Sequence, residues 1–108
     1  MKDFRDKVAF ITGAASGIGF GLARACAAEG MKVALADVRR EALREAVRTL
    51  TAQGGTALAV PLDVTERAAW ELAAATVARE LGPVQILCSN AGVNLVGATA
   101  EATFEDWD

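Results

Sequence analysis

The sequence predicts an α/β fold in which a parallel sheet carries helices on both faces. Short apolar runs without polar alternation recur along the chain, and segments with helical periodicity separate them. Such runs are typical of strands that are buried on both faces, as parallel strands are. Strands that alternate with helices in this way predict a doubly wound sheet with the pattern βαβαβαβ.

The elements follow from the local patterns. Four strands are expected at residues 7–12, 32–37, 56–62 and 84–88, with helices after residue 17, over 39–53 and from Thr65 to 81. Gly30 suits the position that follows the first helix, and Thr65 suits the cap of the third. Thr103, with Glu105 and Asp106 after it, predicts the start of a further helix.

Apolar spacing predicts which side of each helix faces the sheet. The expected inward residues are Ile18, Leu22, Ala25 and Cys26 in the first helix, Leu43, Ala46, Val47 and Leu50 in the second, and Trp70, Ala73, Ala74, Val77 and Leu81 in the third. Arg40, Arg44 and Arg48 form a basic stripe on the opposite side of the second helix. Glu41 and Glu45 interleave with this stripe, so we interpret it as a solvated helix face and expect no contact with nucleic acid.

One proline predicts the strand order. Pro61 cannot donate a hydrogen bond within a sheet, so the third strand should lie at an edge. The Rossmann order 3-2-1-4-5-6 places the third strand there. The fourth strand would then be the opposite edge, which its apolar residues make unsuitable for exposure. We therefore expect residues 1–108 to be the N-terminal part of a single Rossmann domain.

Composition limits the functional classes. The chain has 108 residues, a net charge of −3, 53% hydrophobic residues, two cysteines, and neither histidine nor tyrosine. These values exclude a disordered chain, and no apolar run is long enough to span a membrane. The charged N-terminus has no signal-peptide core, and Cys26 and Cys88 are expected to be reduced, so a cytoplasmic protein is predicted.

A glycine-rich turn predicts a binding site for a dinucleotide. Residues 12–19 read Thr-Gly-Ala-Ala-Ser-Gly-Ile-Gly between the first strand and the first helix, and Asp37 ends the second strand. Glycines let the backbone approach a pyrophosphate, and a helix N-terminus supplies free N–H groups for it. A turn that only packs a helix remains the alternative. No Gly-Lys-Ser/Thr follows, so a phosphate-loop hydrolase is not expected.

The spacing Thr-Gly-x-x-x-Gly-x-Gly resembles the short-chain dehydrogenase/reductase family. Asp37 after the second strand, Asp63-Val64 after the third and Asn90-Ala91-Gly92 after the fourth match the family in order. The segment 104–108, Phe-Glu-Asp-Trp-Asp, resembles the start of the next helix of the family.

The resemblance implies a role for each matched residue. The pyrophosphate and adjoining ribose would be lined by Gly13, Ser16, Gly17, Ile18 and Gly19. Asp37 would accept hydrogen bonds from the adenosine ribose, and Asp63 and the Val64 backbone would contact adenine. Asn90, Ala91 and Gly92 would brace the strands and touch the second ribose. The structural alternatives are a solvated acid for Asp37, a helix cap for Asp63 and a bracing role alone for Asn90.

The family implies hydride transfer between a nicotinamide and an alcohol or carbonyl of a small-molecule substrate. Its chemistry needs a tyrosine with a lysine four residues on, a serine and an asparagine, and none of these is matched. We therefore expect no catalytic residue and no turnover in this chain alone, and a homo-oligomer for the complete enzyme. A non-catalytic nucleotide-binding module and a module completed by a partner at the fourth strand remain alternatives.

The cofactor is predicted to be NAD rather than NADP. Asp37 would repel a 2′-phosphate where it reads a hydroxyl, and Ser16 stands where NADP-using relatives often carry a basic residue. Arg39 and Arg40 favour the opposite choice if they fold back toward that phosphate. We give Asp37 more weight, because a strand end is fixed and arginines at a helix start can point to solvent.

Overall fold

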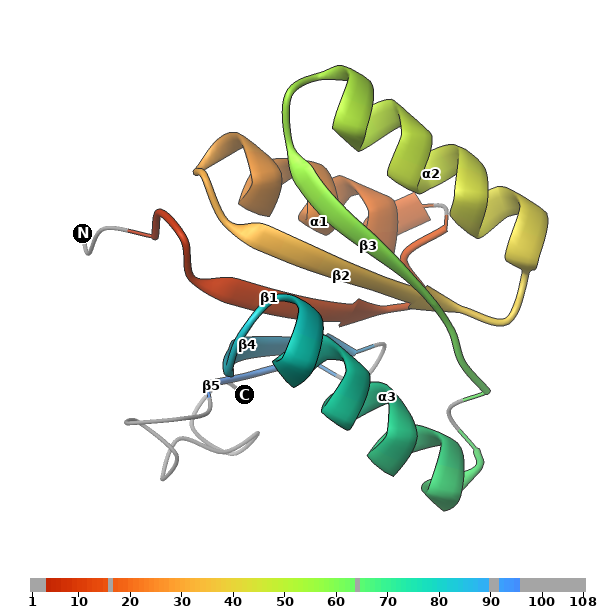
Figure 1. Ribbon diagram of the computed structural model, residues 1–108. Helices are drawn as coiled ribbons and strands as arrows, with labels where there is room; N and C mark the ends of the chain where they lie inside the picture. The colour runs from red at the N-terminus through yellow and green to blue at the C-terminus, as the bar shows by residue number, and fades with distance from the viewer. Residues whose placement is uncertain (1–3, 16, 64, 90–91, 96–108) are drawn as a thin grey trace.

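A computed structural model describes residues 4–15, 17–63, 65–89 and 92–95 of the chain (Figure 1). The elements in chain order are β1 (Val8–Thr12), α1 (Gly17–Ala28), β2 (Lys32–Asp37), α2 (Arg40–Ala52), β3 (Thr56–Pro61), α3 (Arg67–Glu80), β4 (Val84–Ser89) and β5 (Gly92–Leu95). The predicted elements between residues 7 and 89 are confirmed. The predicted helix start at Thr103 lies outside the described residues.

One sheet contains all five strands in the order β3-β2-β1-β4-β5. Strands β1 to β4 are mutually parallel, as the apolar runs predict. Pro61 pairs with Asp37 at the end of β3, and β3 is an edge strand, so the inference from this proline is confirmed.

The prediction that β4 would be an open edge is wrong. Strand β5 pairs with it in the antiparallel direction, with Ile86 opposite Leu95 and Ser89 opposite Gly92. Asn94 lies within β5. An antiparallel neighbour needs only a short connection, whereas another parallel strand would require a crossover of a dozen residues or more. The chain thus turns back on itself and satisfies the backbone groups of an apolar strand that would otherwise be exposed.

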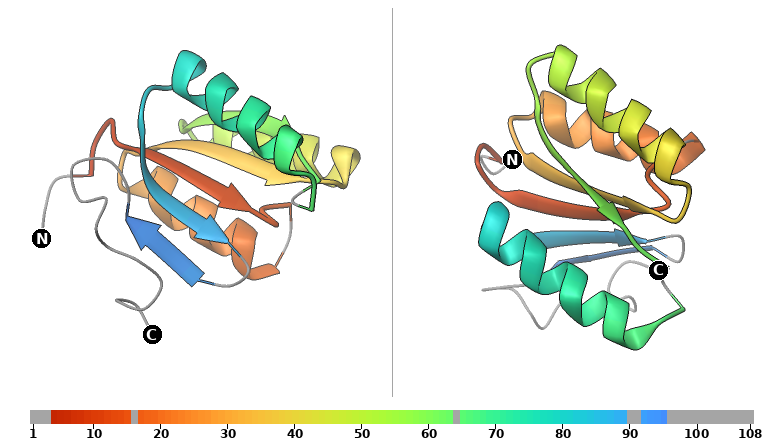
Figure 2. Two further views of the ribbon diagram at one scale, coloured as in Figure 1. Left: turned by 90° about the horizontal axis from the view of Figure 1, so that it is seen from below. Right: turned by 45° about the vertical axis from the view of Figure 1, so that its right-hand side comes forward.

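Helices cover both faces of the sheet, with α1 and α2 on one side and α3 on the other (Figure 2). The strands supply side chains to both sides. In β1, Ala9 and Ile11 belong to the core under α1 and α2, while Val8 and Phe10 belong to the core under α3. All five residues of β1 are buried, which is why this strand has no polar alternation.

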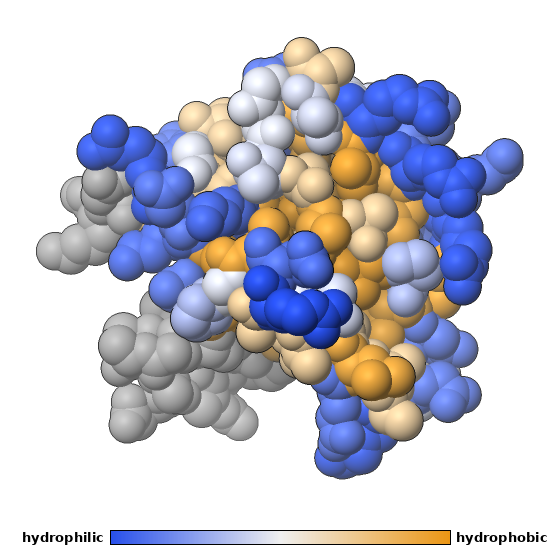
Figure 3. All heavy atoms as spheres, in the orientation of Figure 1, coloured by the Kyte–Doolittle hydropathy of each residue, from blue (hydrophilic) through white to orange (hydrophobic). Residues whose placement is uncertain are grey.

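The two cores are not covered equally. The first is shared by strands and two helices and includes Ala23, Leu43 and Leu50. The second is covered by α3 through Ala73 and Val77. Figure 3 shows hydrophobic residues at the surface in the middle of this side, between α2 and α3, with hydrophilic residues around the rim.

The predicted inward face of α1 is wrong for Ile18, Leu22 and Ala25, which are exposed, and correct for Cys26. Ile18 is 84% exposed and Leu22 is 36% exposed, whereas Ala23 is fully buried. Phe20, Cys26 and Ala27 pack against the same core from this helix. The helix is rotated toward its smaller residues because its first turn lies directly against the backbone of the preceding loop, as described below.

The other two helices agree better with prediction. In α2, Leu43, Ala46 and Leu50 are buried, and Val47 packs beside them. The arginine stripe on its opposite side is exposed, and Arg48 forms an ion pair with Glu45. Within the part of the chain that the structure describes, no helix is long and apolar enough to cross a membrane.

Two details of α3 differ from prediction. Ala74 is exposed, while Trp70 is half-buried with its ring 5.6 Å from that of Phe10. Thr65 does not cap the helix, because the N-cap is Glu66 and it makes no side-chain capping bond. The expectation for Gly30 is confirmed, since it follows α1 with a φ of 87°.

The core under α1 and α2 yields a stability prediction. Leu50 is 1% exposed, so Leu50→Ala should lower the free energy of unfolding by about 2–5 kcal/mol through lost burial and a cavity. Leu72→Ala makes the same chemical change at a residue that is 71% exposed and should cost less than about 0.5 kcal/mol. Urea titration monitored by circular dichroism measures both, and equal losses would show that the core is not organised as described.

Candidate functional site

Parallel pairing places the carboxyl ends of β1 to β3 at one edge of the sheet. Thr12, the last residue of β1, pairs with Ala36, and Asp37 follows at once in β2. The glycine-rich turn leaves β1 at this edge. In open α/β sheets, ligands bind in the crevice outside this edge.

The turn itself is held against β2. Ala14 is fully buried, and its N–H donates a hydrogen bond of 3.1 Å to the carbonyl of Ala36. Gly13 and Gly17 have φ angles of 61° and 65°, which L side chains rarely adopt. The glycines therefore permit a reversal that brings the chain back across the end of the sheet.

Gly19 is required for a different reason, because the backbone of α1 approaches the backbone of the turn closely at this residue. A Cβ atom at this position would overlap the carbonyl oxygen of Gly13 and lie 2.7 Å from its carbonyl carbon. Helix α1 thus packs on the turn through backbone atoms alone. This contact turns the side of α1 that carries Gly19 and Ala23 inward, and it explains why Ile18 and Leu22 lie outside.

Gly17 borders open space. A Cβ atom built there meets nothing within 4 Å, although the residue lies at the first position of α1. Ile18 beside it is the most exposed large hydrophobic residue of the described chain. The start of the helix therefore has a free approach for a ligand whose phosphates bind backbone N–H groups.

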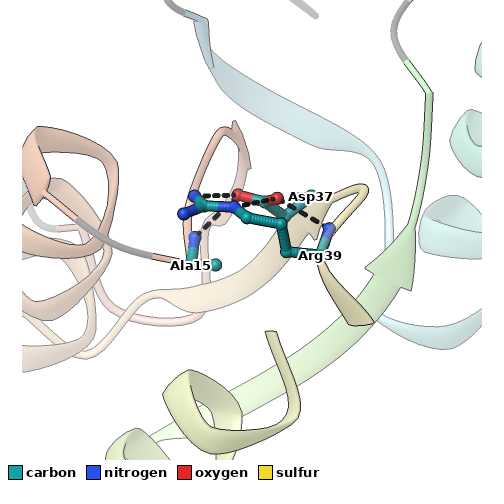
Figure 4. Close-up of polar contacts among 3 residues, drawn as sticks. All are labelled: Ala15, Asp37 and Arg39. Atoms are coloured by element: carbon teal, nitrogen blue, oxygen red, sulfur yellow. Dashed lines mark hydrogen bonds and ion pairs between the residues drawn. The ribbon is translucent and has the colours of Figure 1, made fainter. Parts of the chain in front are cut away.

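Asp37 is a buried carboxylate beside this turn. The residue is 6% exposed. Its Oδ2 accepts a hydrogen bond of 3.1 Å from the Ala15 N–H, and its Oδ1 accepts one of 2.9 Å from the Arg39 N–H (Figure 4). The Ala15 bond joins the glycine turn to the end of β2, so the two predicted parts of the site are brought together.

The Arg39 side chain completes the surroundings of Asp37. Its Nε donates to Oδ1 and its Nη2 donates to Oδ2, each at 3.0 Å, so the guanidinium binds the carboxylate through both oxygens. These side-chain hydrogen bonds are the main reason that the pKa of Asp37 falls from 3.8 to about 2. The expectation that Arg39 points to solvent is wrong for this structure, because its guanidinium binds the Asp37 carboxylate.

Asp63 has a local structural role. It is exposed, and its Oδ1 accepts hydrogen bonds of 3.0 Å from the Thr65 N–H and 2.7 Å from the Thr65 hydroxyl. The hydroxyl bond is the largest cause that lowers the pKa of Asp63. The Asp63 carbonyl also accepts a bond of 3.1 Å from the Glu66 N–H. These contacts form a turn that precedes α3, whose N-cap is Glu66, so the alternative that Asp63 caps the helix is wrong.

The remaining predicted residues are placed as follows. Ser16, Val64, Asn90 and Ala91 lie outside the described residues. Gly92 begins β5 and pairs with Ser89. The structure thus brings together Gly13, Gly17, Gly19 and Asp37, with Ala15 linking the turn to the acid.

Sequence reasoning missed the Ala15 N–H and the pairing of Arg39 with Asp37. The Ala15 N–H carries no side-chain signal, so no residue type points to it. Arg39 had a signal, because it follows Asp37 by two residues across a strand-to-helix junction, where a long side chain can turn back.

Other reactive groups do not suggest a second centre in the described part of the chain. No group of three or more cysteine, aspartate or glutamate residues there is placed to hold a metal ion. Cys26 and Cys88 are free thiols, as expected. Burial raises the pKa of both, that of Cys88 to about 11, so neither favours the thiolate form needed for nucleophilic chemistry.

The fold and this edge define a dinucleotide-binding α/β domain. The profile of the short chain dehydrogenase family matches residues 7–108, and the chain belongs to this family. A C alpha-dehydrogenase from Sphingobium sp. (strain NBRC 103272 / SYK-6) is 47% identical over 109 residues, which cover 100% of this chain and 36% of that protein.

Solved structures agree with this placement. A short chain dehydrogenase/reductase from Burkholderia phymatum, in complex with NAD, superposes with a TM-score of 0.78 at 41% identity, covering 81% of this chain and 31% of that one. L-Sorbose reductase from Gluconobacter frateurii, complexed with NADPH and L-sorbose, gives 0.77 at 34% identity, covering 98% and 41%. The chain therefore spans less than half the length of these relatives.

The backbone contact at Gly19 yields a prediction with an internal control. Gly19→Ala should lower the free energy of unfolding by about 1–3 kcal/mol or more, because the added methyl group overlaps the Gly13 carbonyl. Gly21→Ala makes the same change one half-turn further along α1, where nothing lies within 4 Å. It should be neutral or stabilising by up to about 1 kcal/mol. Denaturant unfolding distinguishes them, and a harmless Gly19→Ala would contradict the contact.

The contact of the Arg39 guanidinium with both carboxylate oxygens predicts how Asp37 titrates. Its folded pKa of about 2 lies below the ordinary value of 3.8, so its contribution to stability is present above pH 3.8 and is lost as the pH falls toward 2. Carboxyl-carbon NMR titration should give a pKa near 2 in the wild type and a higher one in Arg39→Gln. Arg40→Gln removes the neighbouring charge and should leave the pKa of Asp37 nearly unchanged. Equal pKa shifts in the two variants would argue against a specific contact between the Arg39 guanidinium and the carboxylate.

Proposed function

We propose that the protein binds NAD at the carboxyl edge of its sheet and serves hydride transfer between nicotinamide and an alcohol or carbonyl of a small molecule. The observation that carries this proposal is the hydrogen bond from Ala15 in the glycine turn to the buried carboxylate of Asp37. It links the glycine turn, which would bind the phosphates, to the acid that would bind the ribose. Membership of the short chain dehydrogenase family supports the reaction class.

The residues at this edge fit a dinucleotide. The open space at Gly17 and the N–H groups at the start of α1 would receive the pyrophosphate, with Gly13, Ser16, Ile18 and Gly19 around it. Asp37 would accept from the adenosine ribose. Asp63 and Val64 would border adenine, while Asn90, Ala91 and Gly92 would lie near the second ribose, as the family motifs imply.

The cofactor would supply the hydride acceptor, and the residues of this chain would bind and orient it. The tyrosine and lysine that move the proton in this family have no counterpart here, so we assign them to a catalytic half outside residues 1–108. We further propose that the complete enzyme is a cytoplasmic homo-oligomer that binds neither nucleic acid nor membranes.

The choice of NAD over NADP rests on charge. The low pKa of Asp37 keeps its carboxylate ionised at neutral pH. A 2′-phosphate carries nearly two negative charges and would face this carboxylate where NAD presents a hydroxyl. A tenfold preference requires only about 1.4 kcal/mol, which a buried like-charge contact readily exceeds. Relatives of both kinds have been solved, one with NAD and one with NADPH.

Calorimetry on the full-length protein tests this proposal. The wild type should bind NAD at least tenfold more tightly than NADP. Asp37→Ser should lose NAD affinity and reduce the preference, because the ribose loses its acceptor and the 2′-phosphate loses its repulsion. Glu41→Ser removes an exposed acid at the start of α2 and serves as the control for net charge. Equal or tighter binding of NADP by the wild type would overturn the assignment.

A second measurement separates an enzyme from a binding module. If the encoding gene continues with a serine followed by Tyr-x-x-x-Lys, the full-length protein should reduce NAD with a secondary alcohol among a tested panel. Residues 1–108 alone should bind without turnover, because they contain no tyrosine. Turnover by a rigorously purified 108-residue chain, abolished by Gly17→Trp, would refute the assignment of the chemistry to a second half.

A further inference from the structure

We infer that Arg39 is a specificity-determining residue that competes with the cofactor ribose for Asp37 and thereby narrows the preference for NAD over NADP. This inference rests on the proposed function, since it concerns how the same acid is used. It starts from the geometry of Figure 4, in which two nitrogens of the Arg39 guanidinium donate to the two carboxylate oxygens of Asp37.

The first step is that the carboxylate is fully engaged. Two backbone N–H groups and two side-chain N–H groups donate to its two oxygens, at distances between 2.9 and 3.1 Å. A carboxylate offers about four lone-pair positions. A ribose that donates two hydroxyl hydrogens to Asp37 must therefore displace existing donors.

The second step identifies which donors can leave. The backbone N–H groups of Ala15 and Arg39 are fixed by the turn and by the start of α2. The Arg39 side chain is 55% exposed, whereas that of Asp37 is 4% exposed. The arginine can therefore turn into solvent with little loss of packing, while the aspartate cannot move. Binding of NAD would exchange two hydrogen bonds from a charged guanidinium for two from neutral hydroxyl groups, which reduces the net gain.

The third step concerns NADP. A released guanidinium remains tethered two residues from Asp37, at the place where the 2′-phosphate would be. Guanidinium binds phosphate oxygens through two parallel hydrogen bonds. Arg39 thus weakens the binding of NAD, because it competes with the ribose for Asp37. It also reduces the repulsion between Asp37 and the 2′-phosphate of NADP. Both effects reduce the discrimination that Asp37 alone would give.

The variant Arg39→Gln isolates the side chain, because the backbone N–H of residue 39 still donates to Asp37. On full-length protein, calorimetry should show NAD binding about fivefold tighter and NADP binding weaker, so that the ratio of the two dissociation constants widens about tenfold or more. Arg40→Gln removes the same charge from the next residue and should change either constant by less than about twofold. Thermal unfolding of each variant establishes that it is folded.

A second variant separates the contact of residue 39 with both carboxylate oxygens from the positive charge of its side chain. Arg39→Lys keeps a cation for the phosphate but cannot span both carboxylate oxygens. This variant should bind NAD more tightly than the wild type does, and its affinity for NADP should not fall. If Arg39→Gln leaves NAD binding unchanged or weaker, Arg39 does not compete with the ribose and the inference is overturned while the proposed function stands. If no form of the protein binds either dinucleotide, the proposed function fails and this inference fails with it.

Discussion

The contact of α1 with the glycine turn is the constraint on which the site depends. Because Gly19 has no side chain, the helix backbone lies against the carbonyl of Gly13, and this closeness fixes both the direction and the rotation of α1. The rotation places Ala23 in the core and leaves Gly17 and Ile18 at the surface. A larger residue at position 19 would have to move the helix away from the turn, and the open N-terminus would move with it.

The second constraint is the position of a charge at the end of a buried strand. Asp37 is the continuation of a β2 strand whose last five residues are buried, so its carboxylate leaves water as the sheet forms. An unpaired charge in such a place is costly. Donors from Ala15 and Arg39 offset that cost, and they also join the turn, the strand and the start of α2 into one unit. The residues that stabilise the acid are thus the ones that shape the site around it.

The sequence predicts much of this fold because the parallel strands are largely apolar runs and a glycine with positive φ follows each helix, at Gly30, Gly54 and Gly82. Pro61 indicated the edge strand correctly, and the motif spacing placed Gly13, Gly17 and Asp37 at one edge. The face of α1 was not predictable from hydrophobicity, because backbone contact at Gly19 outweighs the burial of Ile18. Strand β5 was missed because its four residues, Gly-Val-Asn-Leu, include a glycine and an asparagine, which are depleted in strands and favour loops.

The components of the site differ in how far they depend on distant parts of the chain. The turn, α1 and the end of β2 are consecutive in sequence, and the bonds from Ala14 to Ala36 and from Ala15 to Asp37 close this unit locally. The opposite flank depends on a distant segment, because β4 pairs with β1 across more than 70 residues and Gln85 accepts the Val8 N–H at 2.9 Å, where the register shifts. The positions proposed for phosphate and ribose therefore lie within a single β-α-β unit, whereas the flank beyond β1 depends on the strands that join the sheet beside it.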